Sequence, residues 1–142
     1  MFQEDLEAGC KRFKLPVGIL SHIDNELYRI KFLVGKTDSF KINDKFPLEA
    51  LYCKHVYSKR TTLAFHDVSE PSGKLLHPLY DAVQLQSYIS TPVIINNIIY
   101  GTLNFSSFEK KENEFTNDDI LFIEELAMSV QKKLIDEMKK SV

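Results

Sequence analysis

The sequence predicts an α+β domain in which helices at the two ends of the chain cover one face of a mostly antiparallel sheet. Amphipathic helical patterns occur near both ends, and strand-like patterns with a period of two fill most of the chain between them. The order helix, two strands, irregular segment, strand, short helix, two strands, helix favours a sheet of about five to six strands, with the irregular segments over its other face. Because the chain has 142 residues, of which 44% are hydrophobic, we expect residues 1–142 to form a single domain.

The composition excludes several classes of partner. A formal net charge of -2, with lysines that alternate with acidic residues, leaves no electrostatic footprint for nucleic acid. No apolar run approaches the ~18 residues that cross a membrane. The two cysteines, Cys10 and Cys53, lie far apart and make no disulfide framework. We therefore expect a cytoplasmic protein with no nucleic-acid partner and no membrane partner.

One helix is predicted near each end of the chain. The apolar stripe of the first helix consists of Phe2, Leu6, Cys10 and Phe13. This helix ends before Leu15, because the proline that follows Leu15 disfavours helical backbone there. Thr116 or Asn117 can cap the last helix, and two aspartates follow in its first turn. The apolar stripe of the last helix consists of Ile123, Leu126, Ala127, Val130, Leu134 and Met138.

Strand-like patterns begin directly after the first helix. Residues 17–23 and 27–34, joined by a turn at Asp24-Asn25-Glu26, form a predicted hairpin. Alternation along its second arm puts Tyr28, Ile30 and Phe32 on one face. The segments that follow are a third strand at residues 61–68, a loop at residues 69–74 and a short helix that begins at His77-Pro78.

Residues 87–107 form a second predicted hairpin around a turn at Asn96-Asn97, two residues that tolerate positive φ. The period of two puts Ile99, Gly101, Leu103 and Phe105 on the helix-covered face, and Tyr100, Thr102, Asn104 and Ser106 on the other face. In the simplest register Ser87, Ile89 and Thr91 lie beside Ser106, Asn104 and Thr102, and Ser90 lies beside Leu103. Pro92 cannot donate to the ladder, and a bulge there would change this register.

Several short segments share their order with one known family. In the second half they are Ser-Tyr-Ile-Ser-Thr-Pro at 87–92, Ile-Ile-Tyr-Gly-Thr-Leu-Asn-Phe-Ser-Ser at 98–107 and Phe115-Thr116-Asn117-Asp118-Asp119. In the first half they are Leu51-Tyr52-Cys53, His66-Asp67-Val68 and His77-Pro78-Leu79-Tyr80. Together they resemble a GAF domain, the small-molecule-sensing module of bacterial signalling proteins, and are most similar to GAF domains attached to sensor histidine kinases. The resemblance runs from roughly Leu6 to Leu134, with one departure at Ser90, where the family commonly has glycine.

The resemblance implies a ligand pocket between the sheet and the segments that cross its open face, at residues 49–60 and 75–85. The candidate ligand-binding residues near these segments are Tyr52, Cys53, His66, Asp67, His77 and Tyr80. The candidates from the second hairpin are Ser87, Thr91, Thr102, Asn104 and Ser106. This mixture of groups suits a small planar or polar ligand. The alternative is that these groups satisfy one another and leave no room for a ligand.

The cofactor stays unassigned. Bilin-binding members of the superfamily carry a cysteine near the start of the covering helix, but residues 72–85 contain none, which leaves Cys53 as the remaining candidate. Haem would need His66 or His77 as an axial ligand, a role that few single histidines have. Cyclic-nucleotide-binding members carry an Asn-Lys pair, of which Asn43-Asp44-Lys45 is a broken version.

We expect a non-catalytic sensing module and no enzyme. The sequence has no glycine-rich phosphate loop, no Gly-x-Ser-x-Gly elbow and no His-Glu-x-x-His helix. Superfamily members that reduce free methionine sulfoxide use several cysteines on the covering loops, and this chain has at most one there. The predicted function is to sense a small molecule and to pass the signal to the terminal helices. The alternative is a dimerisation or interaction module with a vestigial pocket.

The last helix also predicts a homodimer. Its stripe continues to Met138, farther than a sheet face of this size can cover, and an exposed apolar stripe marks an interface. We expect Leu134 and Met138 to lie near the two-fold axis. The other expected partners are an unidentified small molecule and a histidine kinase or another output domain.

Overall fold

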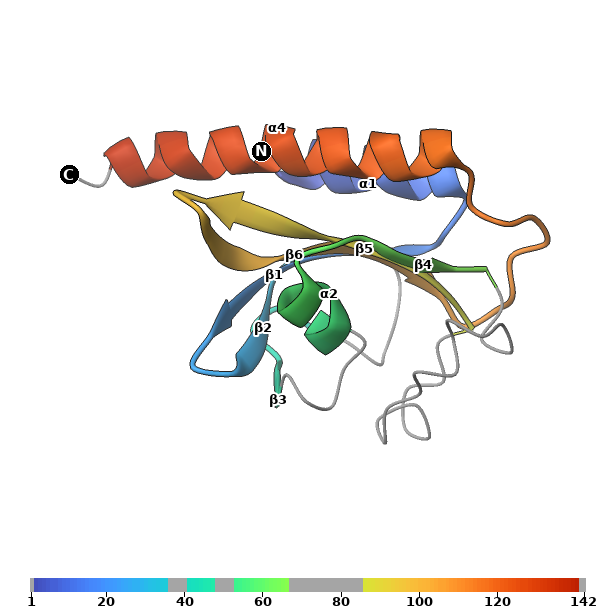
Figure 1. Ribbon diagram of the computed structural model, residues 1–142, viewed down its shortest axis with the longest axis horizontal. Coiled ribbons are helices and arrows are strands. Elements are labelled where there is room, and N and C mark those ends of the chain that lie inside the picture. The colour runs from blue at the N-terminus through green and yellow to red at the C-terminus, as the bar shows by residue number, and fades with distance from the viewer. Residues whose placement is uncertain (1, 36–40, 48–52, 67–85, 141–142) are drawn as a thin grey trace.

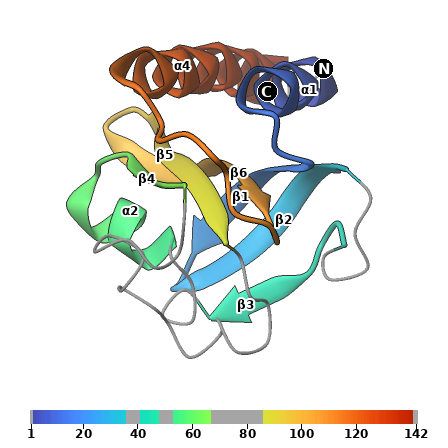
Figure 2. The same ribbon diagram turned by 90° about the vertical axis from the view of Figure 1, so that its right-hand side faces the viewer.

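A six-stranded sheet separates two layers of helix (Figures 1 and 2). The structure is a computed structural model that describes residues 2–35, 41–47, 53–66 and 86–140, with the backbone alone for residues 53–55. The elements are α1 (Phe2–Phe13), β1 (Val17–Asp24), β2 (Leu27–Val34), β3 (Lys45–Pro47), α2 (Cys53–Lys59), β4 (Leu63–Phe65), β5 (Ser87–Ile95), β6 (Ile98–Ser107) and α4 (Asn117–Lys140). Helices α1 and α4 lie side by side over one face of the sheet, and α2 lies against the other.

The strand order is β3-β2-β1-β6-β5-β4, and each neighbouring pair is antiparallel. The predicted α+β class, with terminal helices on one face, is therefore confirmed. The third predicted strand is shorter than expected, because β4 ends at Phe65. The loop predicted at residues 69–74 and the helix predicted from His77 lie outside the described residues.

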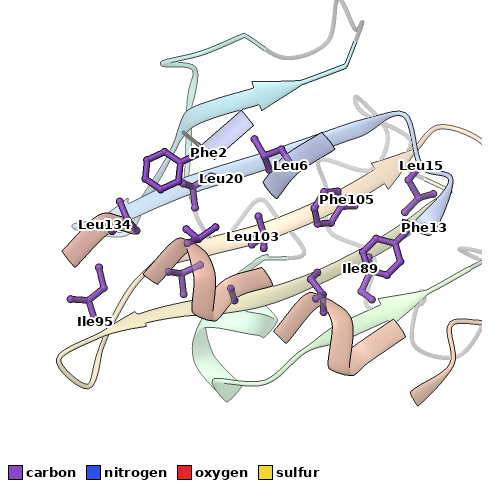
Figure 3. Packing of buried hydrophobic residues seen from close by; sticks show 14 residues of the cluster. Phe2, Leu6, Phe13, Leu15, Leu20, Ile89, Ile95, Leu103, Phe105 and Leu134 are labelled. Atoms are coloured by element: carbon purple, nitrogen blue, oxygen red, sulfur yellow. The ribbon is translucent and has the colours of Figure 1, made fainter. Parts of the chain in front are cut away.

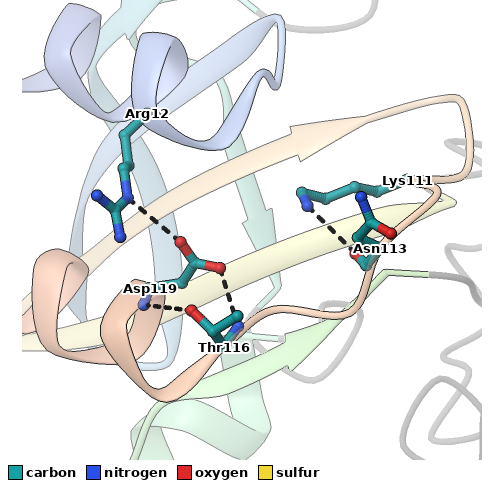
Figure 4. Close-up of polar contacts among 5 residues, drawn as sticks. All are labelled: Arg12, Lys111, Asn113, Thr116 and Asp119. Carbon is teal, nitrogen blue, oxygen red and sulfur yellow. Dashed lines mark hydrogen bonds and ion pairs between the residues drawn. The ribbon is translucent and has the colours of Figure 1, made fainter.

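Local signals set the ends of both terminal helices. Helix α1 has acidic residues in its first turn and basic residues in its last, as the helix dipole favours, and it ends at Phe13, before Lys14 with its φ of 57°. Helix α4 starts with a capping box (Figure 4). The Asp119 backbone N–H donates to Thr116 Oγ1 at 3.1 Å, and the Thr116 backbone N–H donates to Asp119 Oδ2 at 2.9 Å. Of the two predicted caps, the structure therefore selects Thr116.

The larger hydrophobic core lies between the sheet and helices α1 and α4 (Figure 3). Phe13 and Phe105, from α1 and β6, have ring centroids 5.4 Å apart. Polar contacts also hold α1 against α4: Lys133 Nζ donates to Asp5 Oδ2 at 2.8 Å, Ser129 Oγ donates to Asp5 Oδ1 at 3.2 Å, and Arg12 Nε donates to Asp119 Oδ1 at 3.3 Å. Both terminal helices are therefore fastened to the same sheet face and to each other.

A β-bulge in the first hairpin corrects the predicted facing of Phe32. Leu20 pairs with Phe32 but Ser21 pairs with Ile30, which leaves Lys31 as the extra residue. Tyr28 and Ile30 share a face, as predicted, and this is the α2 face. The Phe32 ring lies instead on the α1 side, 4.8 Å from the ring of Phe2. The prediction failed because a bulge reverses the alternation of all residues beyond it.

A second bulge changes the register of the β5–β6 hairpin. Ile94 pairs with Ile99 but Val93 pairs with Gly101, so Tyr100 is the extra residue on β6. Tyr100 packs against the helix-side core and stacks on His22, at 4.2 Å between ring centroids, and not with the polar row as predicted. For the same reason Ile99 does not share a face with Leu103, although the simple alternation predicted that it would. A Cβ atom on Gly101 would collide with the Ser21 carbonyl oxygen, so the close approach of β1 and β6 at this point requires glycine.

Candidate functional site

A row of hydrogen-bonded polar side chains crosses the α2 face of the sheet. Ser21 Oγ and Thr102 Oγ1 lie 2.8 Å apart, and the Thr102 backbone N–H donates to Ser21 Oγ at 3.0 Å. Asn104 Nδ2 donates to the Tyr28 hydroxyl at 3.0 Å and to Thr102 Oγ1 at 3.4 Å. None of these four residues is more than 4% exposed. The row joins β1, β2 and β6 into one buried network.

The surroundings of this row are apolar and aromatic. The buried cluster on this face consists of Val17, Ile19, Ile23, Tyr28, Ile30, Val56, Leu63, Phe65 and Tyr88, with Val56 contributed by α2. The rings of Phe65 and Tyr88 stack at 5.6 Å, and that of Tyr28 lies 6.4 Å from Phe46. Among the described residues, the one buried charged side chain is Asp5, which belongs to α1 on the opposite face. The α2 face is therefore electrically neutral in its described part, where hydrogen bonds are strengthened by low polarity.

Ser90 adds a further hydroxyl group to this face. It pairs with Asn104 on one side and with Leu63 on the other, and directly paired residues point to the same face of a sheet. The predicted position beside Leu103 is therefore wrong, because the bulge at Tyr100 shifts the pairing by one residue. Ser90 is fully buried, and its Oγ has no hydrogen-bond partner among the described residues.

Three of the predicted hairpin residues lie on the α2 face and two do not. Thr102, Asn104 and Ser106 are buried there, as expected from the alternation of β6. The expected facing of Ser87 and Thr91 is wrong, because the same register shift pairs them with Ser107 and Leu103. Ser87 Oγ donates instead to the Glu109 carbonyl oxygen at 2.8 Å. Thr91 Oγ1 lies 2.8 Å from Thr62 Oγ1, close to α4.

The predicted residues near the covering segments are only partly described. His66 follows β4, and its carbonyl oxygen accepts a hydrogen bond from the Lys111 backbone N–H at 2.8 Å. His66 also lines a cavity of about 290 Å³ with residues around the start of α4, such as Phe115 and Ile120, and no member of the polar row is among the described residues that line it. The side chains of Tyr52, Cys53, Asp67, His77 and Tyr80 lie outside the described residues, although the backbone of Cys53 begins α2.

Sequence reasoning missed two members of the polar row, Ser21 and Tyr28. The signal for Ser21 was a single hydroxyl residue inside an otherwise apolar strand. Tyr28 was expected to share a face with Ile30 but was not assigned to the pocket, since its partner Asn104 is 76 residues away in the sequence. Only the pairing of β1 with both β2 and β6 brings these residues together.

Thiol and metal chemistry find little support in the described residues. Burial, followed by the charge of Glu7, raises the pKa of Cys10 from 9.0 to about 11, so the thiol stays protonated at neutral pH and is a poor nucleophile. Burial, and then the charge of Arg29, lowers the pKa of His22, so this imidazole is neutral at pH 7. In the described part of the chain, no group of three or more histidine, cysteine, aspartate or glutamate residues is placed to hold a metal ion.

A three-residue connector, Arg60-Thr61-Thr62, joins α2 to the edge strand β4 and contacts α4. Arg60 Nη2 donates to the carbonyl oxygen and the side-chain oxygen of Asn97, at 3.2 and 3.3 Å, in the turn of the β5–β6 hairpin. Thr62 Oγ1 donates to Glu124 Oε2 of α4 at 3.2 Å. The connector lines a cavity of about 290 Å³ whose other wall includes Ala127, Met128 and Gln131 of α4. The two layers of helix are thus joined by side-chain contacts at this edge.

Comparison with solved structures shows the same fold in bacterial proteins of several kinds. The GAF domain of a two-component sensor histidine kinase from Bacillus halodurans matches with a TM-score of 0.72 and 14% identity, over 100% of this chain and 99% of that chain. The GAF domain of an Acinetobacter phosphoenolpyruvate-protein phosphotransferase matches with a TM-score of 0.74 and 14% identity, over 96% and 80%. Free methionine-R-sulfoxide reductase from Neisseria meningitidis matches with a TM-score of 0.73 and 18% identity, over 98% and 78%.

Comparison of sequences identifies the family. Curated protein sequences give no significant match. None of the described helices is both long enough and apolar enough to span a membrane.

A family model described as GAF domain matches residues 1–131, which is most of the chain and includes α1, all the described strands and the first part of α4. With the antiparallel sheet, the two helical layers and the buried polar row already in place, this match shows that the chain belongs to the GAF domain family.

Proposed function

We propose that this GAF domain is a non-catalytic sensor of a small molecule in bacterial signal transduction. The ligand is held between the sheet and the segments over its α2 face, and the signal passes to the terminal helices. The observation that carries this proposal is the buried polar row of Ser21, Thr102, Asn104 and Tyr28. A network of this kind, set among aromatic and aliphatic side chains, provides the few directed polar groups in an apolar setting that ligand sites use.

The connector between α2 and β4, which contacts α4, supports the second half of the proposal. A ligand that shifts α2 also pulls on Arg60 and Thr62, which contact the hairpin turn and Glu124 of α4. A ligand shifts a conformational equilibrium only if it binds one of the two states more tightly. The contact between Thr62 and Glu124 would make the position of α4 one of the features that differ between these states. The expected recipient is a histidine kinase or another output domain in the cytoplasm.

Recovery of a bound compound tests the sensing function. The protein is purified without denaturation, the solvent-extracted small molecules are analysed by mass spectrometry, and the same is done for Asn104→Ala. We expect a compound that is enriched in the wild-type extract and depleted in the variant, because the variant lacks the central amide of the row. A matched control is Asn113→Ala, which changes an exposed asparagine far from the row and should retain the compound. Equal extracts from all three proteins would contradict the proposal.

The outer surface of α4 supports a homodimer, and it also favours the alternative function of an interaction module with a vestigial pocket. Leu121, Met128 and Met138 are 56%, 66% and 46% exposed, and the first two are one heptad apart on the helix. Leu134, which we expected near the two-fold axis, is only 5% exposed and belongs to the internal core. We therefore propose a dimer through Leu121, Met128 and Met138. If no compound is recovered but the protein dimerises through these exposed residues, the interaction module is the better description.

A further inference from the structure

Two serines on the α2 face differ in one respect. Ser21 and Ser90 are both 0% exposed. Ser21 Oγ accepts a hydrogen bond from the Thr102 backbone and lies 2.8 Å from Thr102 Oγ1, whereas Ser90 Oγ has no partner among the described residues. A buried hydroxyl group that lacks a hydrogen bond destabilises a folded protein, because it has lost its contacts with water and gained none in return.

The position of Ser90 relates this unsatisfied group to the proposed pocket. Ser90 pairs directly with Asn104, the residue that joins the polar row to Tyr28. Its other neighbour in the sheet is Leu63, which belongs to the same buried cluster as Val56 of α2. The Ser90 hydroxyl therefore extends the polar row from β6 to β5, on the face of the sheet where α2 lies (Figure 1).

We propose that Ser90 is a specificity-determining residue of the pocket and that its hydroxyl group is reserved for a hydrogen bond with the ligand. This inference rests on the proposed sensing function. It also indicates the class of ligand: an uncharged, flat heterocycle with a neutral hydrogen-bonding edge, such as an amide or imide, that spans Ser90 and Asn104.

The neutrality of the site argues for this class. Among the described residues on the α2 face, no buried side chain carries a charge, and a charged ligand would enter a site of low polarity without an opposite charge. The aromatic side chains of this face, Tyr28, Phe65 and Tyr88, favour a flat ring over a flexible chain. A serine hydroxyl can donate and accept, so it serves either atom of an amide edge.

The first test needs no ligand. Wild type, Ser90→Ala and Ser21→Ala are unfolded in urea, dialysed to remove bound compounds, refolded and compared by thermal unfolding. We expect Ser90→Ala to raise the melting temperature by about 3 °C, because it removes an unsatisfied hydroxyl group, and Ser21→Ala to lower it. If Ser90→Ala lowers the melting temperature as Ser21→Ala does, the hydroxyl group has a partner within the fold and the proposal is overturned.

The second test uses four neutral heterocycles, uracil, adenine, nicotinamide and lumazine, with benzoate and spermidine as charged probes. We expect at least one heterocycle to stabilise the wild type, and Ser90→Ala to bind it about ten-fold more weakly. Equal binding by wild type and Ser90→Ala would overturn the role of Ser90 and leave the sensing function intact. Binding of a charged probe alone would overturn the ligand class. If no probe binds and no compound is recovered from the native protein, the sensing function fails, and the proposed role of Ser90 fails with it.

Discussion

The two faces of the sheet are built from the same strands but are stabilised in different ways. On the helix-covered face, Leu103 and Phe105 of β6 pack against α1 and α4 in an apolar core. On the α2 face, Thr102 and Asn104 of the same strand are equally buried but are held by hydrogen bonds. An apolar face gains stability from each atom that it buries, whereas a polar face is stable only while its groups are paired. We therefore expect the helix-covered face to provide most of the stability.

The largest expected effect comes from the helix-covered face. Phe105 is 0% exposed and contacts Phe13 of α1, so Phe105→Ala should lower the free energy of unfolding by about 4 kcal/mol, from lost burial and the cavity left behind. Urea unfolding followed by circular dichroism measures this change. Met128→Ala is the control, because Met128 is 66% exposed and its truncation should change the stability little. A loss below about 1 kcal/mol for Phe105→Ala would mean that this face is not the main source of stability.

Substitutions on the α2 face should lower the free energy of unfolding by less. The effects of changing Asn104 and Tyr28 should also depend on each other, because these residues share a hydrogen bond. Asn104→Ala leaves the Tyr28 hydroxyl without its Asn104 donor and should cost about 2 kcal/mol. Tyr28→Phe should cost about 1 kcal/mol, since it removes the other partner of the same bond. The double variant should lose less than the sum of the two, because both changes remove one shared hydrogen bond. Strictly additive losses in urea unfolding would show that the two side chains act independently.

The contact between α1 and α4 should depend on pH. Burial raises the pKa of Asp119, but hydrogen bonds from the Thr116 backbone and side chain and the charge of Arg12 outweigh it, and the pKa lies below its usual value of 3.8. The stability that Asp119 contributes is therefore present above its unfolded-state pKa and is lost as the pH falls through the folded-state pKa.

The corresponding variant is Asp119→Asn. It should lower the free energy of unfolding at pH 7 by about 1 kcal/mol, the typical contribution of a helix cap, and the difference from wild type should shrink as the pH approaches 2. Thermal unfolding across this pH range measures it. Asp136→Asn, an exposed residue of α4, is the matched control. A difference that is unchanged at low pH would indicate that the carboxylate charge is not the source of the effect.

Substitutions on the outer surface of α4 should have the smallest effect on the stability of the fold. They should have the largest effect on dimerisation. Met128→Glu together with Met138→Glu places like charges in the proposed dimer seam but leaves the internal core untouched. Light scattering should show a dimer for wild type and a monomer for the variant, with the same melting temperature for the isolated subunit. Leu134→Glu is unsuitable for this test, because Leu134 is buried and its replacement should unfold the domain. A monomeric wild type at high micromolar concentration would contradict the dimer.

Much of the fold could be predicted because the signals are local. The stripe of α1, the cap of α4 and the two hairpin turns each depend on residues close together in the sequence, and Asn25, Glu26, Asn96 and Asn97 do adopt the positive φ that such turns need. The alternation of β6 also assigned Leu103, Phe105, Thr102, Asn104 and Ser106 to the correct faces. These features require no knowledge of the neighbouring strands.

Tertiary structure alone decided the register of the strands and the exposure of the last helix. The bulges at Lys31 and Tyr100 reversed the facing of Phe32, Ser90 and Thr91. Nothing in the amino-acid sequence of either strand marks the position of such an extra residue. The bulge at Tyr100 lies next to a contact between distant segments, the close approach of Gly101 to Ser21. In the same way, the stripe of α4 could not distinguish buried Leu134 from exposed Met138, because that distinction depends on where α1 and the sheet end beneath the helix.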